Sequence, residues 1–416
     1  MAKEAVLVDA VRTPFGRAGN RGVLKDITHV DFMVPLMKAI VERNKLDPNV
    51  IDEFSVGSAQ LVGMLTRARM YVFEAGFPDT VSATDVNKQC ASSLQTITMG
   101  AHAIMCGMSD VVLAGGIETM DRVGPIPPGG DALSIDNPQV MMEFMKRENW
   151  QMYPDKQAKL LPQWFQIKAP WVMNMGQTAE KLSDVYNISR EDSDKFAQAS
   201  QERAVAAQDA GKFGREIIPL TIEYLNGQTV TIDKDQGPRR ESTLEKLATL
   251  KGAYKPEGGL VTAGNSCPRT EGATLTLLMS KEKAKELGLK PLLTFRGAAT
   301  IGTDPEIMGI GPLPATQKLL KRYGWSLNQF DLIEINEAFA CQVVATMRGL
   351  DSNERDERLN VNGGAIAFGH PLGATGARLV GTMAYEMERR GGRWGLATLC
   401  IGGGMGMSLA WEREDY

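Results

Sequence analysis

The sequence lacks the features that define several large classes of protein. It has five cysteines in 416 residues, an odd number, and none of them forms a Cys-x-x-Cys pair. A disulfide framework or a structural zinc site is therefore not expected. No apolar run approaches the ~20 residues that cross a bilayer. No apolar stretch of roughly 7–15 residues follows a basic start, so we read no secretory signal. We expect a cytoplasmic protein with reduced thiols.

The chain also lacks a large excess of either positive or negative charge. The chain has 46 Lys and Arg against 50 Asp and Glu, a formal net charge of −4, which gives no broad electrostatic surface for nucleic acid. Hydrophobic residues make up 43% and charged residues 23%, as in globular proteins. Because 416 residues exceed one ordinary core, we expect two or three domains whose partners bind in local pockets.

Short β-branched and apolar runs alternate with segments of helical length, which predicts an α/β architecture. The order of these elements repeats. A helix after Cys90 leads to a strand that ends in glycines, and a helix from Gly373 leads to another such strand. This pattern predicts two similar α/β halves. The predicted strands are Ala5–Asp9, Phe54–Gly57, Val111–Ala114, Leu292–Arg296, Leu332–Glu334 and Gly395–Cys400. The predicted helices are Asp31–Arg43, Ser92–Cys106, Thr178–Tyr186, Arg190–Ala210, Ala315–Tyr323 and Gly373–Arg389.

Residues 121–172 differ in composition from the rest of the chain. They are rich in Pro, Met, Gln and Trp and contain three of the six tryptophans. A segment of this length with little strand pattern is usually functional or a small subdomain. Ser189 is a plausible N-cap for the helical stretch that follows, with Glu191 and Asp192 in its first turn.

Cys90 lies in Asn87-Lys-Gln-Cys-Ala-Ser-Ser93, directly before an amphipathic segment of helical length. A thiol at a helix N-terminus lies at the positive end of the helix dipole, which predicts a lowered pKa and a reactive thiolate. The small residues after it leave the sulfur approachable. The alternative is a buried cysteine that only fills space, and the local sequence does not decide between the two.

His370 is one of three histidines and lies in the glycine-rich segment Asn362-Gly-Gly-Ala-Ile-Ala-Phe-Gly-His-Pro-Leu-Gly-Ala-Thr-Gly376. Glycines let the backbone approach a ligand closely, and active sites concentrate on loops. The pattern therefore favours a functional imidazole over a core residue. His29 and His102 lie in or beside predicted helices, and we expect them to be structural or exposed.

Polar residues follow two further apolar strands. Cys400 opens the run Ile401-Gly-Gly-Gly-Met-Gly406, where a thiol and backbone N–H groups can face one cleft and supply a proton and an oxyanion hole. The glycine run is equally a tight turn. Asn336 and Glu337 end another strand, either as helix caps or to position a water or an imidazole. Two thiols, one imidazole and one amide suit nucleophilic acyl transfer with a second acid–base step.

Taken in order, these motifs resemble those of the thiolase family of acetyl-CoA acetyltransferases and 3-ketoacyl-CoA thiolases. The resemblance runs from about residue 5 to about residue 410 and covers nearly the whole chain. It is carried by Val11-Arg-Thr-Pro-Phe-Gly16, the Cys90 segment, Ala114-Gly-Gly-Ile-Glu-Thr-Met120, Val261-Thr-Ala-Gly-Asn-Ser266, Asn336-Glu-Ala-Phe-Ala340, the His370 segment and the glycine run after Cys400.

The resemblance implies the thiolase fold, with duplicated α/β halves in a layered αβαβα sandwich and an inserted loop domain. The N-terminal half would comprise residues 1–122 and 244–283, the loop domain residues 123–243, and the C-terminal half residues 284–416. The loop domain would contribute to CoA and acyl binding. The family is usually dimeric or tetrameric, so a homodimer or homotetramer is expected, and an accessory subunit stays an open alternative.

The resemblance also implies roles. Cys90 would be the acylated nucleophile, His370 would take its proton, and Cys400 would be the acid and base at the α-carbon. Asn336 would hold a water that stabilises the enolate oxygen together with His370. Backbone N–H groups of Cys90 and Gly402 would bind the oxyanion. The reaction would be thiolytic cleavage of a 3-ketoacyl-CoA or the reverse Claisen condensation, with CoA as co-substrate and no metal or permanently bound cofactor.

CoA would contact the stretch Asp235-Gln-Gly-Pro-Arg-Arg240, where Arg239 or Arg240 would meet the adenosine phosphate; solvated surface charges are the alternative. The run Ser266-Cys-Pro-Arg-Thr-Glu-Gly272 departs from the family, with Cys267 for a common serine and Arg269 for an aliphatic residue. We place Ser266, Cys267 and Arg269 at the CoA or acyl site.

These departures concern the acyl group. Asn174 stands where short-chain enzymes commonly carry a histidine, and the segment 121–172 is longer than in those enzymes. We therefore predict a substrate larger than acetoacetyl-CoA, aromatic or carboxylate-bearing, with Arg269 pairing with a carboxylate. That Arg269 is an exposed or structurally paired charge is an equal alternative.

Three rival functions were weighed. A ketoacyl-synthase-like condensing enzyme normally pairs its cysteine with two histidines, and only His370 is suitably placed. A non-catalytic thiolase-fold subunit that binds CoA thioesters or serves as a scaffold tends to lose the nucleophile or the base, and both are present. A dinucleotide-binding dehydrogenase is disfavoured because no Gly-x-Gly-x-x-Gly follows the first strand.

Overall fold

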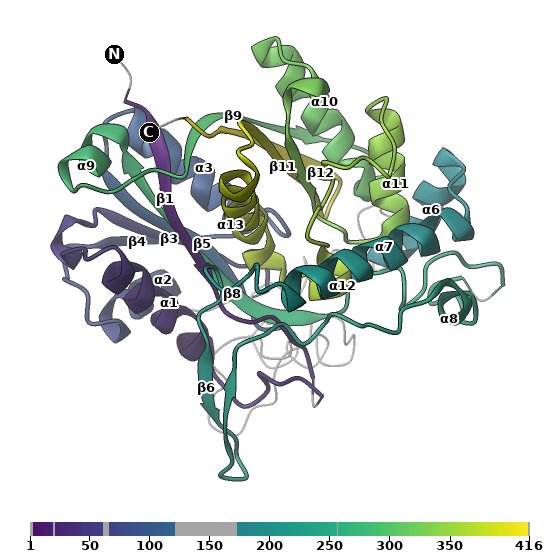
Figure 1. The fold of residues 1–416 in the computed structure, drawn as a ribbon, viewed down its shortest axis with the longest axis horizontal. Coiled ribbons are helices and arrows are strands. Elements are labelled where there is room, and N and C mark those ends of the chain that lie inside the picture. The colour runs from purple at the N-terminus through teal and green to yellow at the C-terminus, as the bar shows by residue number, and fades with distance from the viewer. Residues whose placement is uncertain (1–2, 20, 61–65, 121–172, 256, 415–416) are drawn as a thin grey trace, which may run out of the picture.

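The computed structural model describes residues 3–19, 21–60, 66–120, 173–255 and 257–414; the predicted functional segment 121–172 lies outside them. Most strands form one sheet of order β10-β11-β12-β9-β1-β8-β5-β3-β4, with β2 pairing β8 off this path (Figure 1). The strands are β1 (Ala5–Arg12), β2 (Gly16–Arg17), β3 (Glu53–Gly57), β4 (Ser82–Val86), β5 (Val111–Glu118), β8 (Thr270–Ser280), β9 (Leu293–Gly302), β10 (Leu332–Ile335), β11 (Trp394–Ile401) and β12 (Met405–Glu412).

The strand order confirms the duplication. The series β3-β5-β8-β1 is repeated by β10-β11-β12-β9, and each series begins with a parallel pair followed by two antiparallel pairs. The two halves meet where β1 pairs with β9, through Val6 with Thr294 and Leu7 with Leu293. All six predicted strands are present, whereas β4, β8 and β12 were not predicted.

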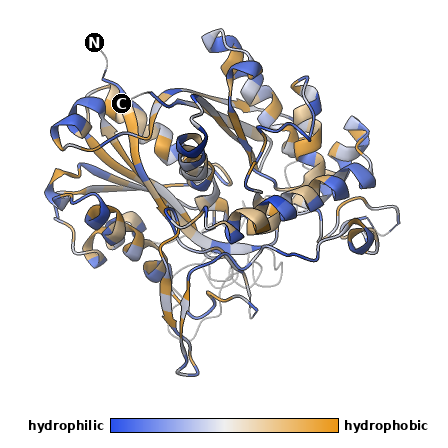
Figure 2. Cartoon of the chain, in the orientation of Figure 1, coloured by the Kyte–Doolittle hydropathy of each residue, from blue (hydrophilic) through white to orange (hydrophobic). Residues whose placement is uncertain are grey.

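Side chains alternate along the strands, as a period of two requires. In β5, Val111 and Leu113 join one apolar core, while Val112 and Ala114 join another on the opposite face. Figure 2 shows hydrophobic residues concentrated along the strands. A sheet that is apolar on both faces must be covered on both, which calls for helices on each side.

Three apolar cores lie between the five layers of the fold: one under each outer helix layer and one around the central helices. The first packs α1 (His29–Arg43) and α2 (Arg67–Glu74) on the outer face of the N-terminal half. The second holds α3 (Ser92–Met105) and α13 (Leu372–Arg390) between the halves, and Figure 1 shows α13 near the middle of the molecule. The third packs α10 (Pro312–Tyr323) and α11 (Ala340–Gly349) on the other outer face. The predicted αβαβα sandwich is confirmed.

Between β5 and β8 the chain forms elements outside the main sheet: α6 (Met175–Tyr186), α7 (Arg190–Asp209), the hairpin of β6 (Leu220–Glu223) and β7 (Thr229–Ile232), and α8 (Leu244–Ala248). The predicted N-cap is confirmed, since Ser189 Oγ accepts from the backbone N–H of Asp192 at 3.0 Å. The remaining short helices are α9 (Lys281–Glu286), α12 (Ala365–Phe368) and the 3₁₀ turns Pro48–Val50, Pro305–Ile310 and Leu327–Gln329. Of the helices within the described ranges, none combines the length and apolarity needed to cross a membrane.

Candidate active site

The two central helices carry the two principal predicted residues at their N-termini. Cys90 directly precedes Ala91, the N-cap of α3, and His370 directly precedes Pro371, the N-cap of α13. The helix starts touch: Ala377 N–H donates to Ser93 Oγ at 2.9 Å. Because α3 and α13 are equivalent helices of the two halves, the duplication itself brings Cys90 and His370 into one layer.

This close approach depends on small residues. A Cβ added at Gly376 would lie 2.6 Å from the backbone nitrogen of Leu94, closer than real Cβ atoms come. The glycines around His370 therefore allow two helix N-termini to pack almost backbone to backbone. That is the close approach that the glycine-rich segment predicts.

Three thiols gather at this point. The backbone N–H groups of Gly402 and of Cys90 itself lower the pKa of the Cys90 thiol, so both donors predicted for an oxyanion hole lie close to this sulfur. The charge of a Cys90 thiolate raises the pKa of both Cys400 and Cys267, which places all three thiols near one another. Cys400 is fully buried and Cys90 is 8% exposed. The structure thus brings Cys90, Cys400 and Gly402 together.

The hydrogen bonds of His370 fix which ring nitrogen is basic. The Thr375 hydroxyl donates to the Pro371 carbonyl at 2.9 Å, so it must accept from His370 Nδ1, which lies 2.6 Å away. Nε2 is therefore the unprotonated ring nitrogen, whose lone pair can accept a hydrogen bond. It accepts from Nδ2 of Asn336 at 3.3 Å. Asn336 and His370 are therefore in direct contact.

The electrostatics correct one prediction. We predicted a lowered pKa for Cys90, but burial raises it to about 11, outweighing the N–H donors of Gly402 and Cys90; the carboxylate of Glu118 raises it further. Burial, reinforced by the guanidinium of Arg378, lowers the pKa of His370 to about 3. At neutral pH the Cys90 thiol is therefore protonated and the His370 imidazole is neutral.

The buried imidazole predicts a pH dependence of stability. The pKa of His370 is about 3 in the folded chain and about 6.5 in the unfolded chain. Below about pH 6.5 the unfolded chain takes up a proton that the folded chain cannot, so the free energy of unfolding falls as the pH falls toward 3. Between pH 7.5 and 5.0 the parent protein should lose about 2 kcal/mol more than His370→Asn. Urea unfolding of both proteins at the two pH values measures this, and equal losses would contradict it.

Asn336 and Glu337 do not cap a helix. Helix α11 begins at Ala340 with Phe339 as its N-cap and no side-chain cap, so that alternative is wrong. Glu337 instead secures the segment before His370. Its carboxylate accepts from Ser200 Oγ at 2.6 Å, from Asn360 Nδ2 at 2.8 Å and from Ile366 N–H at 3.1 Å.

Glu118 was missed as a residue of the site. It ends the fully buried strand β5, and its carboxylate accepts from the N–H groups of Ala59 at 2.9 Å, Gln60 at 3.0 Å and Gly373 at 2.8 Å. Gly373 lies in the first turn after His370, so Glu118 ties the start of α13 to the N-terminal half. A carboxylate at the end of an otherwise apolar strand was the available signal.

The stretch predicted to contact CoA is held by the first strand. Arg12, at the end of β1, forms a two-bond ion pair with Asp235, at 2.6 and 2.8 Å, and donates Nε to Glu216 at 2.7 Å. All three side chains are buried. The motif that begins at Val11 therefore fixes where residues 235–240 leave the core.

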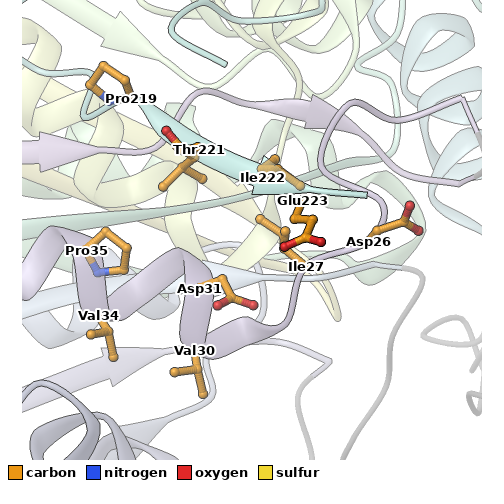
Figure 3. Close-up of a pocket in the computed structure, with 11 residues that line it drawn as sticks. Asp26, Ile27, Val30, Asp31, Val34, Pro35, Pro219, Thr221, Ile222 and Glu223 are labelled. Atoms are coloured by element: carbon orange, nitrogen blue, oxygen red, sulfur yellow. The ribbon is translucent and has the colours of Figure 1, made fainter. Parts of the chain in front are cut away.

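Two neighbouring cavities, of about 270 and about 360 Å³, lie beside this stretch, and Arg239 lines both. Arg240 lines the second and is exposed, with Nη1 paired to Asp209 Oδ2 at 2.7 Å. A separate cavity of about 410 Å³ lies between α1 and β6 and contains none of the predicted residues (Figure 3).

The segment 266–269 connects the thiols to the first of these cavities. The backbone of Cys267 donates to the Ala338 carbonyl at 3.0 Å, its thiol faces Cys90, and the next residue, Pro268, lines the cavity of about 270 Å³. Ser266 Oγ is buried and has no hydrogen-bond partner among the described residues. Arg269 is exposed and donates Nη2 to the Met120 carbonyl at 3.0 Å, next to the segment 121–172.

The other two histidines lie outside the site, as predicted. His29 is half-buried, with its ring edge-on to Tyr71 at 5.5 Å, and His102 is exposed beside Phe295. Only one imidazole among the described residues therefore serves the three thiols.

Comparison with known families agrees with this fold. The family model "Thiolase, N-terminal domain" matches residues 5–282, and "Thiolase, C-terminal domain" matches residues 289–413. The chain belongs to the thiolase family. It is a thiolase-type acyl-CoA acyltransferase, as its relatives are.

Individual relatives are similar along their whole length. A β-ketoadipyl-CoA thiolase of Acinetobacter baylyi is 42% identical over 99% of this chain and 100% of its own. An acetyl-CoA acetyltransferase of Chromobacterium violaceum is 40% identical with the same coverage. The crystal structure of the Bacillus anthracis acetyl-CoA acetyltransferase superimposes with a TM-score of 0.85, at 38% identity and 99% coverage of both chains.

Proposed function

We propose that this enzyme cleaves a 3-ketoacyl-CoA with CoA, or runs the reverse Claisen condensation, through an acyl group carried on Cys90. The proposal is carried by two observations: the thiols of Cys90 and Cys400 lie near each other, and the paired side chains of His370 and Asn336 lie at the start of α13, which packs against the start of α3 after Cys90. These are a nucleophile, an acid, a base and a polar amide in one buried place.

In the cleavage direction, His370 Nε2 accepts the proton of the Cys90 thiol as the sulfur attacks the 3-keto carbon. The tetrahedral oxyanion is held by the N–H groups of Cys90 and Gly402, which lie close to this sulfur. The C2–C3 bond then breaks, leaving the acyl group on Cys90 and an enolate of acetyl-CoA. Each well-placed donor to a developing oxyanion contributes about 3–4 kcal/mol to the rate.

Cys400 protonates the enolate carbon, and acetyl-CoA leaves. The raised pKa of this thiol, caused by burial and by the neighbouring thiols, keeps it protonated and so able to act as the acid. Asn336, with a water and His370, stabilises the enolate oxygen. The Cys400 thiolate then takes the thiol proton of a second CoA, whose sulfur attacks the thioester and takes the acyl group. His370 returns its proton to the departing sulfur, which restores the Cys90 thiol.

CoA would enter past Arg239 and the segment 266–269, because Arg239 and Pro268, the neighbour of Cys267, line the same cavity of about 270 Å³. In this proposal the loop domain, residues 123–243, contributes to CoA and acyl binding beside the two α/β halves at 1–122 with 244–283 and at 284–416. Formation of acetyl-CoA from a 3-ketoacyl-CoA, followed by chromatography, must depend on added CoA. A rate that does not change when CoA is omitted would contradict the proposal.

For the substrate, we propose an acyl group larger than acetoacetyl, with carboxylate-bearing chains first and aromatic chains second. Two of the named relatives, from Acinetobacter baylyi and Pseudomonas aeruginosa, are β-ketoadipyl-CoA thiolases, a name that denotes an acyl group with a distal carboxylate. Arg269 supports the proposal because it is exposed at the end of β5, where the segment 121–172 begins. A guanidinium there can form a two-bond pair with a carboxylate.

Arg269→Ala is expected to reduce kcat/KM for a 3-ketoacyl-CoA with a distal carboxylate by about tenfold or more, since hydrogen bonds to charged groups contribute about 1.5–3 kcal/mol. Activity with acetoacetyl-CoA should change little. Arg322→Ala is the matched control, because Arg322 is also exposed and donates to a backbone carbonyl, that of Ala298. Steady-state kinetics on both substrates measure the ratio. An unchanged ratio in Arg269→Ala would remove the carboxylate assignment.

We also propose a homodimer or homotetramer located in the cytoplasm. Light scattering on the purified chain at several concentrations tests the first point. A monomer with full activity would contradict it.

A further inference from the structure

A buried ion pair lies beside the catalytic base and has no part in the mechanism above. Arg378, on α13, donates Nη1 to Glu334 Oε2, on β10, at 3.1 Å, and both side chains are almost fully buried. Glu334 lies among further charge: burial raises its pKa, Arg378 lowers it, and Glu337 and Glu216 raise it.

The pair makes a poor stabilising contact. Among the described residues, Nε and Nη2 of Arg378 have no hydrogen-bond partner, so a single bond offsets the burial of two charges. Buried ion pairs with incomplete hydrogen bonding are often no more stable than apolar residues of the same size. Stabilisation of the fold therefore does not explain why the Glu334–Arg378 pair lies in the core.

The geometry indicates that role. Glu334 lies on β10 and Asn336 directly follows this strand; two residues apart, they share the face that packs against α13. On the other side, Arg378 lies one turn after Thr375, whose hydroxyl holds His370 Nδ1. Strand and helix are thus joined twice, by the ion pair Glu334–Arg378 and by the catalytic contact Asn336–His370.

We propose that the Glu334–Arg378 pair is a positioning device, which sets the register of α13 against β10 and so holds His370 Nε2 in place against Asn336 and the Cys90 thiol. The inference rests on the proposed function for what His370 does. A slip of about 1 Å at a catalytic base can cost about 10²-fold in rate. Loss of the pair should therefore lower kcat far more than it changes KM.

Two variants test the inference. Glu334→Leu/Arg378→Met removes both charges together, so no unpaired charge is left in the core. Glu334→Asp keeps the charge but shortens the side chain by one methylene, and so moves the contact without removing it. Glu386→Asp is the matched control, because Glu386 is also buried and pairs with arginines, Arg389 and Arg390, farther along the same helix.

We expect both test variants to unfold within a few degrees of the parent, with kcat lowered about 10²-fold, KM within about twofold, and slower alkylation of Cys90 by iodoacetamide. The control should match the parent in all three. Parental kcat and alkylation rate in Glu334→Asp, or in the folded double variant, would overturn the inference. Alkylation of Cys90 needs no acyl-CoA, so it tests the ion pair independently of the proposed function. A parent protein that is alkylated at Cys90 but cleaves no 3-ketoacyl-CoA would refute the proposed function. The alkylation rates of the variants would still test the ion pair.

Discussion

Replacement of Cys90 by alanine is expected to reduce cleavage of a 3-ketoacyl-CoA by about 10⁴-fold or more, because the variant lacks the sulfur that carries the acyl group. The backbone N–H groups of Gly402 and Cys90 both lie close to this sulfur. Cys267 and Cys400 are close, but burial and neighbouring thiols keep the pKa of each well above its usual range. Initial rates of acetyl-CoA formation measure the loss.

Cys106→Ala is the control for this variant, since Cys106 is exposed at the end of α3, the helix that Cys90 precedes. It should retain the parental rate and unfolding temperature. If Cys90→Ala kept more than about a hundredth of the parental rate, uncatalysed background excluded, covalent catalysis at this position would be refuted.

Cys400→Ala is expected to separate the two half-reactions. Acylation of Cys90 by a simple acyl-CoA requires no proton transfer at carbon, so it should remain within a few-fold of the parental rate. Carbon–carbon cleavage requires an acid at the enolate carbon, and its rate should fall by about 10²–10⁴-fold. Rapid-quench measurement of the acyl-enzyme beside steady-state cleavage distinguishes the two steps.

The matched control for Cys400→Ala is Cys341→Ala, because Cys341 is equally buried and belongs to the same apolar core. It should leave both half-reactions intact. Equal losses of acylation and cleavage in Cys400→Ala would assign Cys400 to the structure of the pocket rather than to proton transfer.

Most parts of the candidate site could be predicted from the sequence because each is a local pattern. A cysteine before a helix, a histidine among glycines and a cysteine before a glycine run are each visible within about ten residues. The order of helices and strands likewise indicated two equivalent halves, and so the meeting of α3 and α13. The fold class could be predicted at that level.

What could not be predicted depends on pairings between distant segments. The sign of the Cys90 pKa shift was wrong because a helix dipole can be read locally, whereas the burial that outweighs it comes from the second half of the chain. The ion pair of Arg12 with Asp235 joins the first strand to a residue more than 200 positions away in the chain. Strand β8, which begins with Thr-Glu-Gly-Ala-Thr, lacks a strong apolar alternation at its start, and only its place between β1 and β5 makes it a central strand.

The most direct test is mass spectrometry of the protein after incubation with a 3-ketoacyl-CoA in the absence of free CoA. One acyl group should be found, on the peptide that contains Cys90, and adding CoA should remove it. An unmodified Cys90 peptide, or an adduct that stays on Cys267 or Cys400 instead, would contradict the assignment of Cys90 as the nucleophile of this enzyme.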